Sequence, residues 1–315
     1  MQEIVKEILN ELLSRHENLE PFCRKESEFP SLKIERREFL SLTKENLRGY
    51  VFSKNNSKAE AILVLAHGLG IGGAFCYLDI INYFVNNGFM VFAYDATGNA
   101  ESGGTSCLSI EQGVIDLSEA INYVEKDKIM GQYPIVLFGH SWGAYAVSAV
   151  IKFHKEVKAV CEVAAFNDVE SEFKYQLEYL SLSKDEVQKG CIELLNENER
   201  NIPTLFKNVS AMDGFDNSNA KIFLVHGAKD INVPDKLGYD LFFKKYKDNK
   251  RFVFKHYLDR SHFDLYYSDK AREYRNSYDD KDGYSNFNKA IACELDLSLM
   301  NEIKEFYLFS INNKK

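Results

Sequence analysis

The chain has little of what several common classes of protein need. Of its 315 residues, 39 are Lys or Arg and 47 are Asp or Glu, so the formal net charge at pH 7 is −8. Proteins that bind nucleic acids usually carry a basic excess or a basic stripe, and we therefore expect no nucleic-acid partner. Hydrophobic residues make up 45% and charged residues 27% of the chain, which is typical of a globular protein with a sizeable core.

Recognisable metal motifs and a dense cysteine framework are also missing. The six cysteines are scattered without a CxxC pair, no H-E-x-x-H motif occurs, and the acidic run at 279–283 lacks the pattern of an EF-hand loop. We therefore expect no metal and no cofactor. Several cysteines lie in apolar runs, where a free thiol packs as a small hydrophobe, and this favours a reducing compartment, the cytoplasm.

The chain offers no long uninterrupted apolar run. Residues 1–20 place apolar side chains at helical spacing between charges, which predicts an amphipathic helix and not a signal peptide. Residues 61–78 are the most apolar window, but His67 and four glycines interrupt them. A buried strand that runs into a glycine-rich loop explains this window better than a membrane span does, and we expect no span.

What the sequence does contain is a series of short strands alternating with helices. Residues 33–42 and 47–53 alternate apolar and polar positions, which predicts an antiparallel hairpin. Nearly continuous apolar runs, typical of parallel strands covered on both faces, follow at 61–66, 89–94, 134–139, 157–165 and 221–227, and a further strand is expected at 251–257. Helical patterns occur at 75–87, 110–127, 142–155, 235–247 and 295–311. This alternation predicts an α/β fold with a mostly parallel, doubly wound sheet.

One connection is too long to be a simple crossover. Between the strands that end at 165 and begin at 221, helical patterns occur at 169–180 and 184–199. Six aromatic residues accompany them: Phe166, Phe173, Tyr175, Tyr179, Phe206 and Phe215. We therefore expect 166–220 to be a helical insertion over the sheet, and we expect the polar segment 269–286 to be an exposed excursion.

The strongest chemical signal is the sequence Gly139-His140-Ser141-Trp142-Gly143. It stands directly after an apolar strand and directly before a helix of small residues. A serine on a tight strand-to-helix turn needs small neighbours, because the backbone is strained and other atoms approach closely. The strand-turn-helix context predicts a nucleophile elbow that presents the hydroxyl of Ser141.

A serine hydroxyl is a weak nucleophile, so it needs a base that is itself oriented by an acid. Asp230 and His262 each follow an apolar strand, and the order Ser141, Asp230, His262 is that of an elbow-type triad. Asp235 and Asp264 are the rival acids, and His256 is the rival base.

The developing oxyanion needs two convergent backbone N–H donors. Trp142, directly after the nucleophile, supplies one. The other is expected from Leu69 in the loop after the first parallel strand, with Gly70 as the alternative. This loop, H-G-L-G-I-G-G, lacks the Lys-Ser/Thr of a phosphate-binding loop.

Together these motifs resemble the α/β-hydrolase superfamily, and within it the lid-bearing group of serine aminopeptidase-like hydrolases, monoacylglycerol lipases and feruloyl esterases. The resemblance rests on five blocks: HGLG at 67–70, YDATGNAESGG at 94–104, GHSWG at 139–143, HGAKDINVP at 226–234 and RSHFD at 260–264. In the second block Thr97 and Ala100 stand where the family usually has Arg and Gly.

The resemblance implies an α/β-hydrolase core at 33–165 and 221–315, a lid at 166–220 and an N-terminal helical extension at 1–32. It also implies that Ser141, His262 and Asp230 form an acyl-enzyme without a cofactor. We expect a small-molecule carboxylic ester with a small or medium apolar or aromatic acyl group as substrate. A prolyl-type aminopeptidase, a thioesterase and a non-catalytic binding protein of the same fold are the alternatives, and the oligomeric state is left open.

Overall fold

The computed structural model describes residues 2–18, 23–54, 58–180, 182–279, 281 and 283–312, and its centre is an eight-stranded sheet. The strands are β1 Lys33–Leu40, β2 Asn46–Ser53, β3 Ala61–Ala66, β4 Phe89–Tyr94, β5 Ile135–His140, β6 Ala159–Val163, β7 Lys221–Gly227 and β8 Phe252–Tyr257. Their order is β1-β2-β4-β3-β5-β6-β7-β8. Only the β1–β2 and β2–β4 pairs are antiparallel, so the predicted hairpin and parallel sheet are confirmed.

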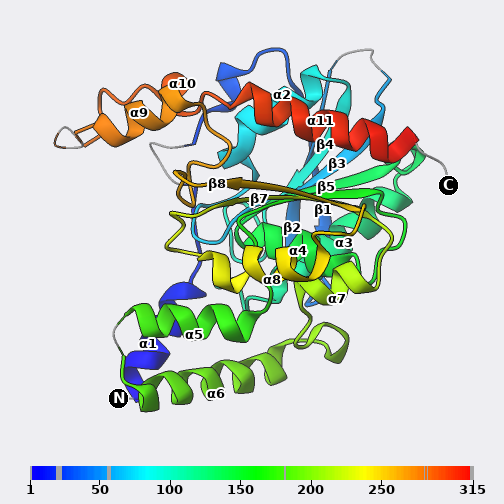
Figure 1. Cartoon of the computed structure of the whole chain (residues 1–315). Helices are drawn as coiled ribbons and strands as arrows, with labels where there is room; N and C mark the ends of the chain where they lie inside the picture. Colours follow the sequence, from blue (N-terminus) through cyan, green and yellow to red (C-terminus); the bar gives the residue numbers. More distant parts are fainter. Residues whose placement is uncertain are drawn as a thin grey trace.

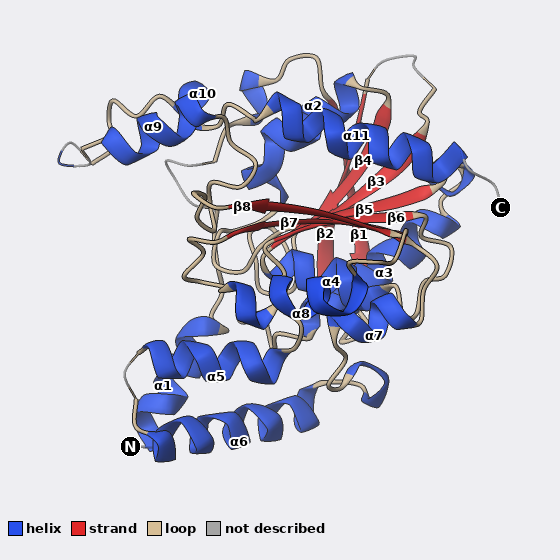
Figure 2. Ribbon diagram, viewed as in Figure 1, coloured by secondary structure: helices blue, strands red, loops and turns tan. Residues whose placement is uncertain are grey.

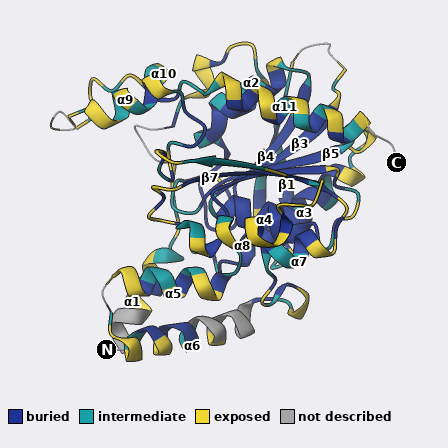
Figure 3. Ribbon diagram, viewed as in Figure 1, coloured by how far each residue is buried: buried dark blue, intermediate teal, exposed yellow. Residues whose placement is uncertain are grey.

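Helices cover both faces of this sheet (Figures 1 and 2). On one face lie α2 Leu78–Asn86 and α11 Leu297–Asn312, and on the other lie α3 Gln112–Lys126, α4 Trp142–Val150, α7 Ala211–Asp216 and α8 Tyr239–Tyr246. Two hydrophobic cores result, and the central strands are buried along their whole length (Figure 3). Among the described helices, none is both long and apolar enough to cross a membrane.

Three further helices lie together beside the sheet: α1 Gln2–Leu12, α5 Val169–Tyr179 and α6 Lys184–Asn201 (Figure 1). α6 packs against both α5 and α1. α1 ends earlier than the predicted helix over 1–20, because the chain after it is extended and bonds to the loop that follows β4. The N–H of His16 donates to the carbonyl of Gly98 at 3.0 Å, and the N–H of Ala100 donates to the carbonyl of His16 at 2.8 Å.

The polar segment 269–286 projects from the body of the molecule, as predicted, but part of it is helical (Figure 1). It contains α9 Asp269–Ser277, and α10 Lys289–Ala292 follows. The Ser268 hydroxyl caps α9 by accepting the N–H of Ala271 at 3.1 Å. Arg275 holds the excursion to the body, because its guanidinium lies 4.0 Å from the centre of the Tyr267 ring.

The sequence pattern indicates free thiols at several cysteines and predicts no disulfide. Cys23 and Cys76 form a disulfide, which ties the segment before β1 to the residues just before α2. Disulfides persist in oxidising compartments, so this pair does not support the expected reducing cytoplasm. The four free cysteines are all buried, as packed thiols are.

Candidate active site

Ser141 lies on a strained turn between β5 and α4. Its φ is 57° and its ψ is −119°, a conformation that L-residues rarely adopt. The flanking glycines explain how the turn fits. A Cβ on Gly139 would collide with the backbone of Gly143, and a Cβ on Gly143 would collide with the carbonyl of Ala66 in β3. The predicted elbow context of strand, tight turn and helix is therefore present.

The structure brings His262 and Asp230 together. Nδ1 of His262 lies 2.7 Å from Oδ2 of Asp230, and both side chains are buried. The other oxygen of Asp230 accepts the N–H groups of Asn232 at 2.9 Å and Val233 at 2.8 Å. Because an ionised carboxylate only accepts, Nδ1 of His262 carries the proton. Its Nε2 is then the basic nitrogen, and no residue in the described part of the chain binds it.

His256 and Asp235 form a second histidine–aspartate pair. Nε2 of His256 lies 3.0 and 3.1 Å from the two carboxylate oxygens of Asp235. These are the residues that sequence analysis kept as rivals of His262 and Asp230. Neither of them lines the cavity that contains Ser141, whereas His262 does. The third rival, Asp264, accepts a hydrogen bond from the Ser261 hydroxyl at 2.6 Å.

The two predicted oxyanion donors, Leu69 and Trp142, line the same cavity as Ser141. Trp142 is the first residue of α4, and the first N–H groups of a helix have no partner within it. Over the described ranges, neither the N–H of Leu69 nor that of Trp142 has a hydrogen-bond acceptor. The same holds for Gly70, so that alternative also stays open.

A chain of hydrogen bonds joins the oxyanion loop to the base. The N–H of Gly68 donates to the hydroxyl of Tyr77 at 2.9 Å, and this hydroxyl lies 3.0 Å from Nδ1 of His140. Nε2 of His140 lies 3.0 Å from the carbonyl of His262. Burial lowers the pKa of His140 to about 3, so the ring is neutral. Nε2–H then donates to the carbonyl, Nδ1 accepts from Tyr77, and His140 fixes the backbone of His262. Sequence analysis did not identify Tyr77, because no local pattern links it to residue 140.

His67 holds the oxyanion loop from its other side. Its Nε2 accepts the N–H of Ala96 at 2.9 Å, and its Nδ1 donates to the carbonyl of Gly68 at the same distance. Burial lowers the pKa of His67 to about 4. The ring is therefore a neutral structural tie between two loops.

The loop that departs from the family pattern has its own supports. Thr97 donates its N–H to Asp116 at 2.7 Å, and its hydroxyl lies 3.2 Å from the same carboxylate. Ala100 has a φ of 39° at the position where the family usually has glycine. The backbone thus keeps a glycine-like conformation although the side chain has changed.

The cavity at Ser141 has a volume of about 630 Å³ and a mostly apolar lining. Of the six aromatic residues in 166–220, only Phe166 and Phe173 line it. Phe206 and Phe215 are instead buried in the core beneath the helices. Tyr175 donates its hydroxyl to the carbonyl of Ile231 at 2.8 Å. The other apolar side chains that line the cavity are Ile8, Leu12, Leu69, Ile71, Ile110, Trp142, Val169, Leu180, Leu182, Val233 and Phe263.

The fold and the motifs can now be compared with known proteins. Residues 57–217, more than half of the chain, match a protein family described as serine aminopeptidase, S33. The chain belongs to this family. It is thus a serine hydrolase of the α/β-hydrolase superfamily, as the motifs implied. A comparison with curated proteins gives no match.

Three solved structures resemble this serine aminopeptidase-family chain. The esterase Pf2001 of Pyrococcus furiosus is 12% identical, with a TM-score of 0.65 over 95% of this chain and 100% of that one. The α/β hydrolase GrgF from a Penicillium species is 17% identical, with a TM-score of 0.57 over 90% and 100%. An acylaminoacyl peptidase of Pyrococcus horikoshii is 16% identical, with a TM-score of 0.57 over 74% of this chain but 38% of that one. At these identities the likeness shows the fold.

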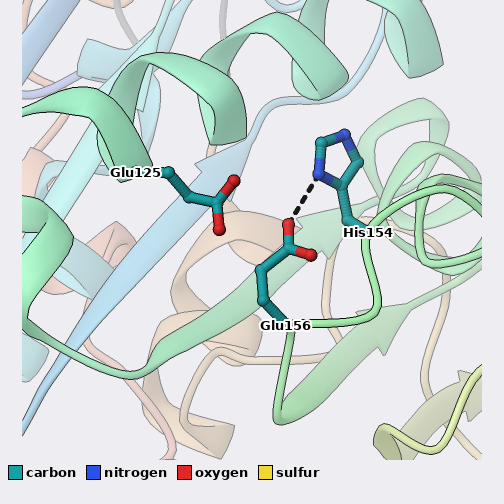
Figure 4. Close-up of side chains that lie close together, drawn as sticks. All are labelled: Glu125, His154 and Glu156. Carbon is teal, nitrogen blue, oxygen red and sulfur yellow. Dashed lines mark hydrogen bonds and ion pairs between the residues drawn. The ribbon is translucent and has the colours of Figure 1, made fainter.

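One cluster of potential metal ligands occurs in the described part of the hydrolase: Glu125, His154 and Glu156 (Figure 4). Both nitrogens of His154 are already engaged, Nδ1 with Glu156 at 2.7 Å and Nε2 with the Ser118 hydroxyl at 2.8 Å. His154 follows the end of α4, whose other end begins at the elbow. The cluster therefore lies at the opposite end of that helix from Ser141 and takes no part in the candidate site.

Proposed function

We propose that this hydrolase cleaves carboxylic esters with a small or medium apolar or aromatic acyl group, through an acyl-enzyme on Ser141. The observation that carries the proposal is that one apolar cavity holds the strained elbow serine and the histidine of a buried His262–Asp230 pair. A serine, a base and an orienting acid in this arrangement are what acyl transfer needs.

In the first half-reaction, Oγ of Ser141 attacks the ester carbonyl carbon while Nε2 of His262 accepts its proton. The carbonyl oxygen becomes an oxyanion that the N–H groups of Trp142 and Leu69 bind, and such donors act most strongly where water is excluded. The C–O bond to the alcohol then breaks, and the imidazolium of His262 protonates the departing alkoxide. Asp230 stabilises that imidazolium and keeps Nδ1 protonated throughout.

In the second half-reaction, His262 removes a proton from water, which attacks the acyl-enzyme. The tetrahedral intermediate collapses, the carboxylic acid leaves, and Oγ of Ser141 recovers the proton. The cycle consumes one ester and one water, and it uses no cofactor. We propose that 166–220 acts as a lid, because α5 supplies Val169 and Phe173 to the cavity above Ser141.

The test is a series of p-nitrophenyl esters of increasing acyl length. Each methylene buried in an apolar pocket is worth about 0.8 kcal/mol, or roughly a fourfold increase in kcat/KM. We expect kcat/KM to rise from acetate to butyrate, to be high also for an aromatic acyl group, and to fall once the acyl chain exceeds the cavity. A flat profile across the series, or no turnover of any ester, would contradict the proposal.

A second candidate function, cleavage of aminoacyl substrates, is favoured by one specific observation. Glu172 lines the cavity, and its Oε2 is buried without a hydrogen-bond partner among the residues described. Its other oxygen accepts from the side-chain amide of Gln176 at 2.7 Å. Burial raises the pKa of Glu172 to about 8, so the carboxyl is neutral until a cation arrives and favours its ionised form. An α-ammonium would be such a cation.

Replacing Glu172 by glutamine separates the two candidates. If aminoacyl compounds are substrates, Glu172→Gln lowers kcat/KM for a prolyl-arylamide by about 10- to 100-fold, because the ammonium loses the buried carboxylate that pairs with it. Turnover of p-nitrophenyl butyrate stays within about twofold, since this ester carries no charge. Glu170 and Glu178, which are exposed on the same helix and do not line the cavity, provide matched glutamine controls. Wild-type protein that cleaves the arylamide faster than every ester would establish the peptidase as the main activity.

A further inference from the structure

We propose that the N-terminal arm, residues 6–18, forms one wall of the substrate cavity, and that Ile8 and Leu12 set the length of the apolar chain that the cavity accepts. This inference rests on the proposed function and adds the determinant of its chain-length specificity. The family match begins at residue 57, so it does not account for the arm.

The arm contributes directly to the cavity that contains Ser141. Ile8 and Leu12, which lie four residues apart on one face of α1, both line it. The polar side chains of Glu11 and His16 line it as well. Both apolar residues are partly exposed, as expected for side chains that border an open cavity. Leu9, by contrast, is buried in the hydrophobic core and does not reach the cavity.

Backbone hydrogen bonds fasten the arm to the loop after β4. Besides the two bonds of His16, the N–H of Cys107 donates to the carbonyl of Leu13 at 2.7 Å. The guanidinium of Arg15 donates to the carbonyls of Ala100, Ser102 and Gly104. Arg15 thus fastens the arm to the loop in which Thr97 stands where the family usually has arginine.

The arm is also fixed to the loop that carries the predicted oxyanion donor. The side-chain oxygen of Asn18 accepts the N–H of Gly73 at 3.0 Å. Asn18 packs so closely on Gly72, which has a φ of 87°, that a Cβ there would collide with the Asn18 backbone. An element held at both loops is a fixed wall. The size of the side chains that it presents should therefore limit the substrate.

The experiment changes the size of the two wall residues and measures chain-length preference. For Ile8→Ala and Leu12→Ala, we expect the ratio of kcat/KM for octanoate to that for butyrate to rise about tenfold, because each variant removes three carbons from the wall. For Leu12→Trp the ratio should fall by a similar factor. Leu9→Ala removes the same atoms from the same helix as Leu12→Ala, so it should lower Tm but leave the ratio within about twofold of the wild type.

Two series show which part of the ester lies against the wall. p-Nitrophenyl esters vary the acyl chain, and alkyl acetates, followed by acid release, vary the alkoxy chain. A shift of the preferred length in either series supports the inference. The inference is overturned if the alanine variants and Leu12→Trp all keep wild-type activity and also keep the wild-type chain-length preference in both series. If Leu12→Trp does not fold, Ile8→Phe makes the same test. Absence of ester turnover in the wild type would instead refute the proposed function itself.

Discussion

Ser141→Ala is expected to abolish ester turnover, with kcat falling by about 10⁴-fold or more. Removal of the Oγ takes away the atom that becomes acylated, and the remaining binding groups supply only a small part of the rate enhancement. The fold should survive, because the change removes a single atom and leaves Gly139 and Gly143, on which the tight turn depends, in place. The measurement is kcat for p-nitrophenyl butyrate, with Tm as the check on folding.

Ser148 provides the matched control. It lies on α4 two turns after the elbow, and its hydroxyl is buried without a hydrogen-bond partner in the described part of the chain. Ser148→Ala should keep full activity, because its hydroxyl is not in the cavity. A fluorophosphonate should label the wild type and Ser148→Ala but not Ser141→Ala. Labelling that survives in Ser141→Ala would show that another residue is the nucleophile.

Much of the fold could be predicted because strand signals are local. The run at 221–227 has the same bounds as β7, and those at 61–66 and 89–94 coincide with β3 and β4. Such continuous apolar runs arise when helices cover both faces of a sheet. The candidate site residues could be named for the same reason, since the motifs stand directly at strand ends, where sheets of this type place their sites.

The features that could not be predicted depend on contacts between distant parts of the chain. The spacing of cysteines in a sequence does not show which of them pair, so the Cys23–Cys76 disulfide could not be predicted. α1 is recognisable as amphipathic, but nothing local shows that Ile8 and Leu12 border the cavity. Tyr77 likewise acquires its position only when η2, Ala74–Tyr77, packs beside the elbow.

Aromatic composition was a poor guide to the cavity for a related physical reason. A helix has several faces, and a cluster of aromatic residues in the sequence does not say which face meets the substrate. Phe173 faces the cavity. Phe215 instead packs in the core against Phe242, Tyr246 and Phe252.

Asp230→Asn is expected to lower kcat by about 10³- to 10⁴-fold while leaving the fold intact, and the contacts of Asp230 explain why. One of its oxygens accepts the N–H groups of Asn232 and Val233, and an amide oxygen can keep both bonds. The new amide nitrogen must then face Nδ1 of His262 as a donor. Nδ1 becomes an acceptor, the proton moves to Nε2, and the ring no longer has a free basic nitrogen for Ser141.

The neighbouring pair supplies the control, because Asp235→Asn makes the same chemical change opposite His256. Since His256 does not line the cavity, this variant should retain kcat within a few-fold. Imidazole ¹⁵N chemical shifts would report the tautomer of each ring, and we expect His262 to change tautomer in Asp230→Asn only. The opposite pattern, with activity lost in Asp235→Asn and kept in Asp230→Asn, would make His256 the base. Loss of kcat without a change of tautomer would mean that Asp230 acts through its charge on the imidazolium and not through the position of the proton.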